Sequence, residues 1–212
     1  KFPFMACAEI TVIEGIPARL FRISFSGELA YEIAVPRRYA DFFVKKISEI
    51  GKKYSLVPYG TEALGVMRIE KGHAAGNELN GQTTAHNLGL GKMVSKLNDC
   101  IGNTMSERDE LNKDDALRLV GFIPTNKQQQ LVAGSHFIEK GQIANLENDQ
   151  GWMSSVAFSP MLNHSIGLGY IKRGNQRYGE KVNAVNPLKN EITEVEIHSP
   201  HFYDPEGELL RG

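Results

Sequence analysis

Cysteine is scarce in this sequence, and long apolar runs and an excess of one charge are absent. The two cysteines, Cys7 and Cys100, cannot form a disulfide framework or a cysteine-based zinc site. No run approaches the ~18 apolar residues of a membrane span, and residues 1–5 do not resemble a signal peptide. Lys plus Arg number 24 against 25 Asp plus Glu, which disfavours a nucleic-acid or anionic-membrane binder. We therefore expect a cytoplasmic protein.

The common cofactor and nucleophile motifs are also missing. The run GLGK at residues 89–92 is not a phosphate-binding loop, because His86 and Met93 stand where that loop needs Gly and Ser or Thr. The candidate dinucleotide fingerprints lack their last glycine, and no G-x-S-x-G occurs. Pro200 disrupts the close pair His198 and His201. We expect this segment alone to bind no flavin, no NAD and no metal.

The first third of the sequence has a mixed α and β pattern. Strands are predicted over residues 9–13, 19–25 and 29–35, with the last two forming a hairpin around a turn at 26–28. Apolar residues spaced by three or four predict an amphipathic helix over 39–54, and a second helix is expected over 61–69. These elements predict an α+β fold with an antiparallel sheet and helices.

The pattern changes in the second half of the sequence. Residues 74–95 indicate a loop, 100–105 a short helix, and the charged run 106–115 a linker. Short β-like runs follow at 117–123, 131–138, 153–158, 166–171, 181–185 and 192–197. Many short strands separated by Gly and Pro predict a small all-β barrel or sandwich. We expect an α+β domain over 1–110 and a β-barrel domain over 116–212.

Glu32 is the residue that chemistry singles out. It shares a strand face with Ala30 and Ala34, and two small neighbours leave room above its carboxylate for a flat ligand. A carboxylate accepts from two adjacent N–H donors, as a pterin ring or a guanidinium presents. The alternative, an exposed Glu on the solvent face of a hairpin, stays open on periodicity alone.

Several runs resemble the glycine-cleavage T-protein (aminomethyltransferase) superfamily. FRISFSGELAYEIAVP (21–36) is similar to its folate-binding hairpin, and YGTEALGVMRIEKG (59–72) to the helix that follows. GNELNGQTTAHNLGL (76–90) and DCIG (99–102) continue the resemblance, and IGLGYI (166–171) is similar to the C-terminal barrel. The tail SPHFYDPEGELLRG (199–212) and Phe25 are similar to the branch formed by sarcosine oxidase alpha subunits. The resemblance covers nearly the whole sequence in order.

The resemblance implies three folate-binding residues. A strand-borne glutamate at the position of Glu32 holds the pterin of tetrahydrofolate, Phe25 lines the same cavity, and Arg68 lies at the folate site. Core packing is the alternative role for Phe25, and an ion pair elsewhere in the fold is the alternative for Arg68. No acidic residue lies four positions from Arg68, so a helical i,i+4 pair does not explain it.

The sequence also departs from the family. The barrel stretch Gly-x-Val-Thr-Ser is GWMSS here, at residues 151–155, and the catalytic aspartate of the family has no counterpart at or before Glu9. We expect the sequence to begin about halfway through the family's folate domain, so its catalytic residue is unknown.

By resemblance, the sequence is the C-terminal folate-binding region of a sarcosine oxidase alpha subunit, which takes part in oxidative demethylation and passes the one-carbon unit to tetrahydrofolate. Flavin and NAD are expected elsewhere in the parent complex. Its partners would be folate, the rest of the alpha subunit and other subunits. Two alternatives remain: a T-protein or dimethylglycine dehydrogenase relative, and a catalytically silent folate-binding or subunit-contact module.

Overall fold

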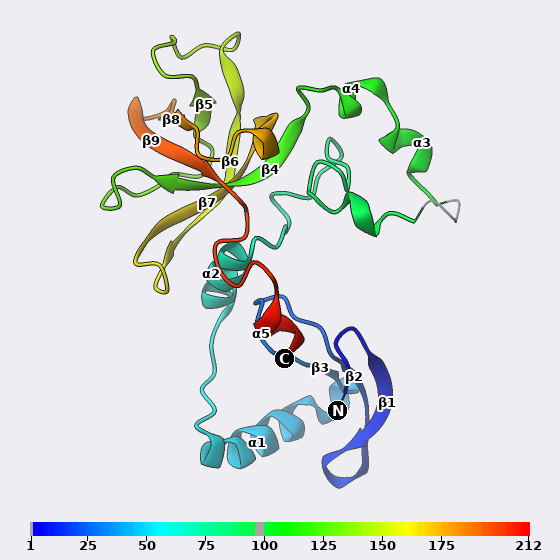
Figure 1. Ribbon diagram of the computed structural model, residues 1–212. Coiled ribbons are helices and arrows are strands. Elements are labelled where there is room, and N and C mark those ends of the chain that lie inside the picture. Colours follow the sequence, from blue (N-terminus) through cyan, green and yellow to red (C-terminus); the bar gives the residue numbers. More distant parts are fainter. Residues whose placement is uncertain (1, 96–99) are drawn as a thin grey trace. The chain divides into compact units, whose positions relative to one another are not determined.

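The computed structural model describes residues 2–95 and 100–212, which form two compact units (Figure 1). The N-terminal unit comprises residues 1–65 and 206–212, and the barrel unit comprises residues 66–205. Asp99, which opens the DCIG run, lies outside the described residues. Among the helices formed by residues 2–95 and 100–212, none has the length and apolar character needed to cross a membrane.

The N-terminal unit contains a three-stranded antiparallel sheet in the order β1-β2-β3. The strands are β1 (Cys7–Val12), β2 (Ile16–Phe21) and β3 (Glu32–Ala34), and the 3-10 turn η1 (Ile13–Gly15) joins the first two. The predicted hairpin is confirmed, since β2 pairs with β3 and Phe21 lies opposite Glu32. Its predicted length is wrong, because the pairing of β2 with β3 ends at Phe21 and Glu32 and residues 22–31 form the loop between them.

The predicted amphipathic helix is confirmed after the sheet. It consists of η2 (Arg37–Tyr39), α1 (Ala40–Gly51) and η3 (Lys52–Tyr54). Phe43 on α1 is buried, and a 2.8 Å ion pair joins Lys45 to Asp41 one turn earlier. The last short helix of the chain, α5 (Glu208–Arg211), also belongs to this unit.

Helix α2 (Thr61–Lys71) confirms the second predicted helix and extends it by two residues. Gly72 ends it with a φ of +78°, which favours glycine. The N–H of Gly72 donates to the carbonyl of Ile69, and the N–H of His73 donates to that of Arg68. This pair of bonds is a Schellman motif, which satisfies two of the last helical carbonyls.

An irregular segment connects α2 to the barrel, as predicted for residues 74–95. It contains η4 (Gly91–Met93) and, beyond the undescribed residues, the single-turn helices α3 (Asn103–Ser106) and α4 (Asp109–Asn112). The α4 turn falls within the predicted linker. The domain boundary expected there stays a prediction, and the two compact units divide within α2.

Six antiparallel strands then close into a barrel in the order β4-β7-β6-β5-β8-β9. The predicted β-barrel is confirmed, and each of its six strands overlaps a predicted run, although β5 occupies only the last three residues of the run 131–138. The 3-10 turn η5 (Gly174–Gln176) lies between the fourth and fifth strands of this set. The strands are β4 (Leu117–Pro124), β5 (His136–Ile138), β6 (Asp149–Ser159), β7 (His164–Lys172), β8 (Lys181–Asn186) and β9 (Glu191–His198).

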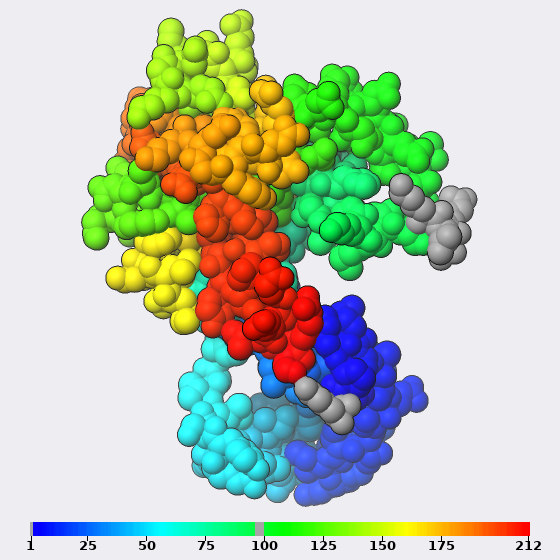
Figure 2. Space-filling model, viewed as in Figure 1, coloured from blue at the N-terminus to red at the C-terminus, as the bar shows by residue number. Residues whose placement is uncertain are grey.

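Two clusters of apolar side chains pack on opposite sides of the barrel wall. The interior contains Val120 and the stacked rings of Phe122 and Phe137, whose centroids are 4.0 Å apart. On the outside, Ile69 of α2 packs against a cluster that includes Leu119 and Tyr170. The end of α2 is therefore built onto the barrel. Figure 2 shows the yellow-green β5–β6 loop projecting from this unit.

Candidate functional site

The last turn of α2 carries three charged side chains that are all buried and all paired. Arg68 pairs with Glu78, with 2.9 Å between Nη1 and Oε2, and Lys71 pairs with Asp204 at 2.9 Å. Glu70 accepts a 2.5 Å hydrogen bond from the hydroxyl of Ser159. Burying a charge without a partner is costly, so these pairs determine how α2 sits on the barrel.

Glu78 is the centre of this arrangement and is 0% exposed. Its Oε1 accepts from the hydroxyls of Ser154 at 2.5 Å and Ser155 at 2.6 Å. Its Oε2 accepts from Arg68 and from the backbone N–H of Ala75, both at 2.9 Å. We call Arg68, Glu78, Ser154 and Ser155 the buried clasp. It joins α2, the following loop and strand β6.

The electrostatics of the clasp favour an ionised carboxylate. Burial alone would raise the pKa of Glu78, but the hydrogen bonds from Ser154, Ser155 and Ala75 and the charge of Arg68 outweigh it and hold the pKa below 4.5. Burial raises the pKa of Tyr170 to about 12, so its phenol stays protonated and donates to the backbone carbonyl of Glu78. The loop around Glu78 is thus fixed by side chain and backbone together.

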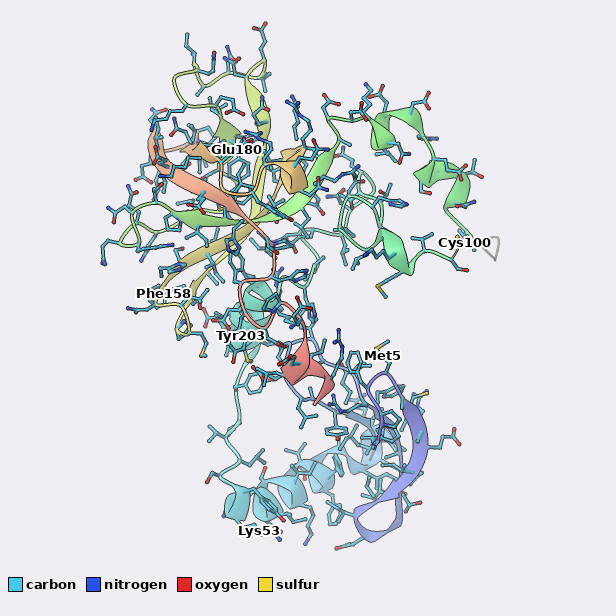
Figure 3. The ribbon with its side chains drawn as sticks, viewed as in Figure 1. Met5, Lys53, Cys100, Phe158, Glu180 and Tyr203 are labelled. Atoms are coloured by element: carbon cyan, nitrogen blue, oxygen red, sulfur yellow. The ribbon has the colours of Figure 1, made fainter. Side chains whose placement is uncertain are left out.

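The C-terminal tail holds the same turn of α2 from another side. The N–H groups of Phe202 and Tyr203 donate to the carbonyl of Glu70 at 3.0 and 3.1 Å (Tyr203 is labelled in Figure 3). His201 Nδ1 lies 2.9 Å from the carbonyl oxygen of Lys71. The tail run that resembles one branch of the family therefore has a structural role in the barrel unit.

In the N-terminal unit, Glu32 and Phe25 are both exposed. Glu32 opens the edge strand β3, and within residues 2–95 and 100–212 its carboxylate has no hydrogen bond or ion pair. Phe25 is 39% exposed and lies in the loop 22–31. The exposure of both side chains is compatible with the pterin contacts that the resemblance implies and equally with a Glu on the solvent face of a hairpin.

Arg22 positions the loop that carries Phe25, a role that its local sequence does not indicate. It is 2% exposed and donates to the carbonyls of Leu210 and Arg211, both at 3.2 Å, and of Ala30 at 3.4 Å. Its guanidinium lies 5.2 Å from the centroid of the Tyr31 ring. The bonds to residues 210 and 211 span most of the chain, so no local pattern could have indicated them.

Arg68, the third predicted folate residue, belongs to the barrel unit and is buried in the clasp. It donates to Glu78, to Ser155 at 2.8 Å and to the carbonyl of His73 at 3.3 Å. A guanidinium has five N–H donors, so at most two remain for a ligand. The ion pair that the sequence analysis held as its alternative role is present.

A hollow of about 670 Å³ lies on the sheet of the N-terminal unit. Neither Phe25 nor Glu32 lines it, although β3 contributes Ala34. Across the described parts of the chain, no group of three or more His, Cys, Asp or Glu side chains is arranged to hold a metal ion. The hollow on the sheet is lined by Glu9, Ile10, Thr11, Pro17, Ala18, Arg19, Ala34, Val35 and Pro36.

Two models of known protein families match the chain in order. The GCVT N-terminal domain matches residues 1–98, and the glycine cleavage T-protein C-terminal barrel domain matches residues 118–204. Together they include most of both units.

The chain is similar to curated proteins of two kinds. Sarcosine oxidase subunit alpha of Rhizobium meliloti (strain 1021) is 44% identical over 99% of the chain and 21% of the relative. The protein of the same name from Corynebacterium sp. (strain U-96) is 34% identical over 100% of the chain and 22% of the relative. The mitochondrial aminomethyltransferase of Mesembryanthemum crystallinum is 30% identical over 90% of the chain and 47% of the relative. The chain thus spans about a fifth of the first relatives and about half of the last.

A solved structure has the same fold. Aminomethyltransferase T of the glycine cleavage system from Bartonella henselae aligns with a TM-score of 0.69 over 89% of the chain and 50% of that structure. The sequences are 21% identical, so this likeness concerns the fold alone.

Proposed function

Since the chain belongs to the glycine-cleavage T-protein (aminomethyltransferase) superfamily, we propose that it is the folate-binding region of an oxidase subunit related to sarcosine oxidase alpha. The observation that carries this proposal is the 44% identity over 99% of the chain, since similarity of that length includes both units and the tail. The parent would oxidise an N-methyl amine such as sarcosine and transfer the one-carbon unit to tetrahydrofolate.

In this proposal Glu32 and Phe25 contact the pterin. The carboxylate of Glu32 is exposed and lacks a protein partner among the described residues, so it can accept both N–H bonds of the ring. Phe25 supplies an apolar wall from the loop held by Arg22. Arg68 belongs to the barrel unit, and its assignment to folate rests on the resemblance and on the N–H donors that Glu78, Ser155 and His73 leave unused.

The chemistry left to these residues is mainly positioning. A nucleophilic folate nitrogen meets an electrophilic imine carbon, and holding the two together supplies much of the rate. Deprotonating the folate nitrogen needs a general base. None of the described residues, Glu32 included, is assigned that role. We propose that the base and the flavin and NAD sites lie in the remainder of the parent polypeptide and its partner subunits.

The experiment uses the complete native polypeptide, purified with any subunits that accompany it. Sarcosine is supplied with and without tetrahydrofolate, and formaldehyde, glycine and methylenetetrahydrofolate are measured. We expect tetrahydrofolate to replace formaldehyde by methylenetetrahydrofolate at equal glycine yield. Sarcosine oxidation with unchanged formaldehyde would indicate a silent module. Folate-dependent transfer from an aminomethyl donor without oxidation would indicate an aminomethyltransferase.

The cellular location of the protein is also a proposal. Cys7 and Cys100 are free and exposed, which suits the reducing cytoplasm that we expect.

A further inference from the structure

The outer face of β5 carries a groove that is separate from the residues assigned to folate. Phe137 points into the barrel, so its neighbours His136 and Ile138 point outward. Residues 144–146 of the β5–β6 loop (139–148) line a groove of about 250 Å³ together with these two side chains. The groove is lined by His136, Ile138, Ala144, Asn145, Leu146, Asp149, Val185 and Pro187.

Exposed large apolar side chains line this groove or adjoin its lining residues in the sequence or in the β8–β9 pair. Leu146 is 92% exposed, Ile143 on the same loop is 76% exposed, and Leu188 in the β8–β9 turn is 94% exposed. Ile192 lies opposite Val185 in the β8–β9 pair and is 59% exposed. Single exposed apolar residues are common, but four around one apolar groove mark an interaction surface.

One wall of the groove is polar and fixed in direction. Nδ1 of His136 lies 2.9 Å from Oδ2 of Asp149, and the N–H of Gly151 donates to the other carboxylate oxygen at 3.0 Å. Within the described parts of the chain, the second ring nitrogen of His136 has no hydrogen-bond partner. The surface therefore offers an apolar groove with one oriented polar group, which suits a polypeptide segment.

The lengths of the relatives indicate what covers this surface. The 211 aligned residues are 21% of the Rhizobium relative, which makes that protein about 1,000 residues long. The 200 residues aligned with the plant aminomethyltransferase are 47% of it, or about 430 residues in all. An oxidase-type parent therefore carries hundreds of residues that an aminomethyltransferase lacks, and these need surfaces on which to pack.

We propose that the groove binds a segment of the same polypeptide that lies outside the T-protein-like module, with an aliphatic or aromatic side chain in the groove and a polar group on His136. This proposal rests on the proposed function, since it assumes an oxidase-type parent. The surface that four exposed side chains provide is small compared with the ~1,600 Å² that a stable intermolecular interface buries. A tethered segment has an effective concentration near millimolar and needs less contact area.

Photo-crosslinking in the complete native polypeptide tests this. Benzoylphenylalanine replaces Leu188 in one variant and Gln128, an exposed polar residue of the β4–β5 loop, in the matched control. We expect position 188 to link to a peptide of the same chain outside these 212 residues, at least tenfold more than position 128 does. Links to another subunit or to a second copy, or a yield no higher than the control, would overturn the proposal.

A second measurement guards against a variant that misfolds. Hydrogen exchange of residues 139–148 should slow at least tenfold in the complete polypeptide relative to a Leu146→Asp, Leu188→Asp double variant, while the barrel strands exchange equally in both. Equal exchange of the loop in the two proteins would also contradict docking. The sarcosine and folate assay on the same preparations separates the two proposals. Activity without a crosslink contradicts the docking surface alone, and a crosslink without activity contradicts the proposed function alone.

Discussion

Glu32 and Glu78 show how differently two carboxylates of one chain are used. Glu32 is exposed on an edge strand, and Glu78 is completely buried and accepts four hydrogen bonds. Glu32 is therefore suited to a donor from a ligand, while the four hydrogen bonds to Glu78 already occupy both of its carboxylate oxygens. A substitution at each position should therefore change a different property.

We expect Glu32→Ala to weaken tetrahydrofolate binding by the complete polypeptide. A hydrogen bond to a charged acceptor contributes about 1.5–3 kcal/mol, and a pterin can donate two. Since 1.4 kcal/mol is about tenfold, the dissociation constant should rise roughly tenfold to several hundredfold in a fluorescence titration. Glu9→Ala, on β1 of the same sheet, is the control and should leave the affinity unchanged. Unchanged affinity for Glu32→Ala would favour the alternative, in which Glu32 is an exposed residue that does not contact folate.

We expect Glu78→Gln to lower the stability of the barrel unit instead. The substitution leaves Arg68 buried without a counter-charge, which typically costs about 3–5 kcal/mol. Urea unfolding followed by the fluorescence of Trp152, the single tryptophan, reports on this unit because the indole packs against Tyr170. Glu62→Gln, exposed near the start of α2, should change the midpoint little.

The same variant should change the pH dependence of stability. The pKa of Glu78 is lowered in the folded state, so its contribution is complete above the unfolded pKa, near 4.5, and is lost as the pH falls through the folded pKa. The wild-type midpoint should therefore fall on acidification below about pH 4.5 more steeply than that of Glu78→Gln. Parallel curves for the two proteins would show that Glu78 is not the titrating group.

At the scale of elements, the junction after α2 is the most constrained. A Cβ on Gly72 would lie 2.4 Å from the carbonyl oxygen of Pro200, and the residue has a φ of +78°. We expect Gly72→Ala to destabilise the barrel unit by more than about 2 kcal/mol, because the left-handed conformation costs about 1–2 kcal/mol and the backbone contact adds to it. Gly179 has a φ of +86° and no atom within 4 Å of a Cβ added there. Gly179→Ala should therefore lower the free energy of unfolding only by the cost of the left-handed conformation. Equal effects in urea unfolding would show that Pro200 moves freely.

The elements also show what the sequence alone could indicate. The barrel strands are short β-like runs separated by turn residues, so their approximate positions could be predicted from the sequence. The prediction for 131–138 was wrong over its first five residues, since Leu131 is buried from a turn that contains Gly134 at φ +82°. Burial outside a strand has the same apolar signature as burial within one.

The clasp could not be predicted for a different reason. Glu78 and Ser155 are 77 residues apart, and neither has a local pattern that indicates burial. Glu32 was singled out by its place on a strand face and then by resemblance, whereas Phe25 and Arg68 were selected by resemblance alone, which carries residue positions but not their contacts. The buried pairing of Arg68 with Glu78 emerged only from the structure.

At the scale of the whole molecule, the two units differ in how well they are packed. Of the twenty buried apolar residues among the described parts of the chain, only Ile16, Ala18 and Phe43 lie in the N-terminal unit. That unit instead exposes large apolar side chains on β3, α1 and the connecting segments, among them Leu29, Tyr31, Ile33, Val44, Tyr54, Val57 and Tyr59. So small a core gives little stability.

We expect the N-terminal unit of the isolated 212-residue chain to open before the barrel does. Limited proteolysis should cleave within residues 22–60 first and leave a resistant fragment over 66–205, because cleavage follows the free energy of local opening. The same sites should resist cleavage in the complete polypeptide if the remainder covers them. Simultaneous loss of both units would show that they unfold together.

Activity is the last property that belongs to the whole molecule. We expect the isolated chain to synthesise no methylenetetrahydrofolate from formaldehyde above the uncatalysed rate. In the proposed function Glu32 and Phe25 contact the pterin, but Arg68 is held in the clasp and no described residue is assigned as the base. Loss of proton transfer alone typically lowers the rate 10²–10⁴-fold.

The open edge of β3 and its exposed apolar side chains also favour self-association, which size-exclusion chromatography would detect. Adding the remainder of the parent polypeptide in trans should restore folate binding if the parts recognise each other. Turnover by the isolated chain, abolished by Glu32→Ala, would instead show that these 212 residues hold a complete site.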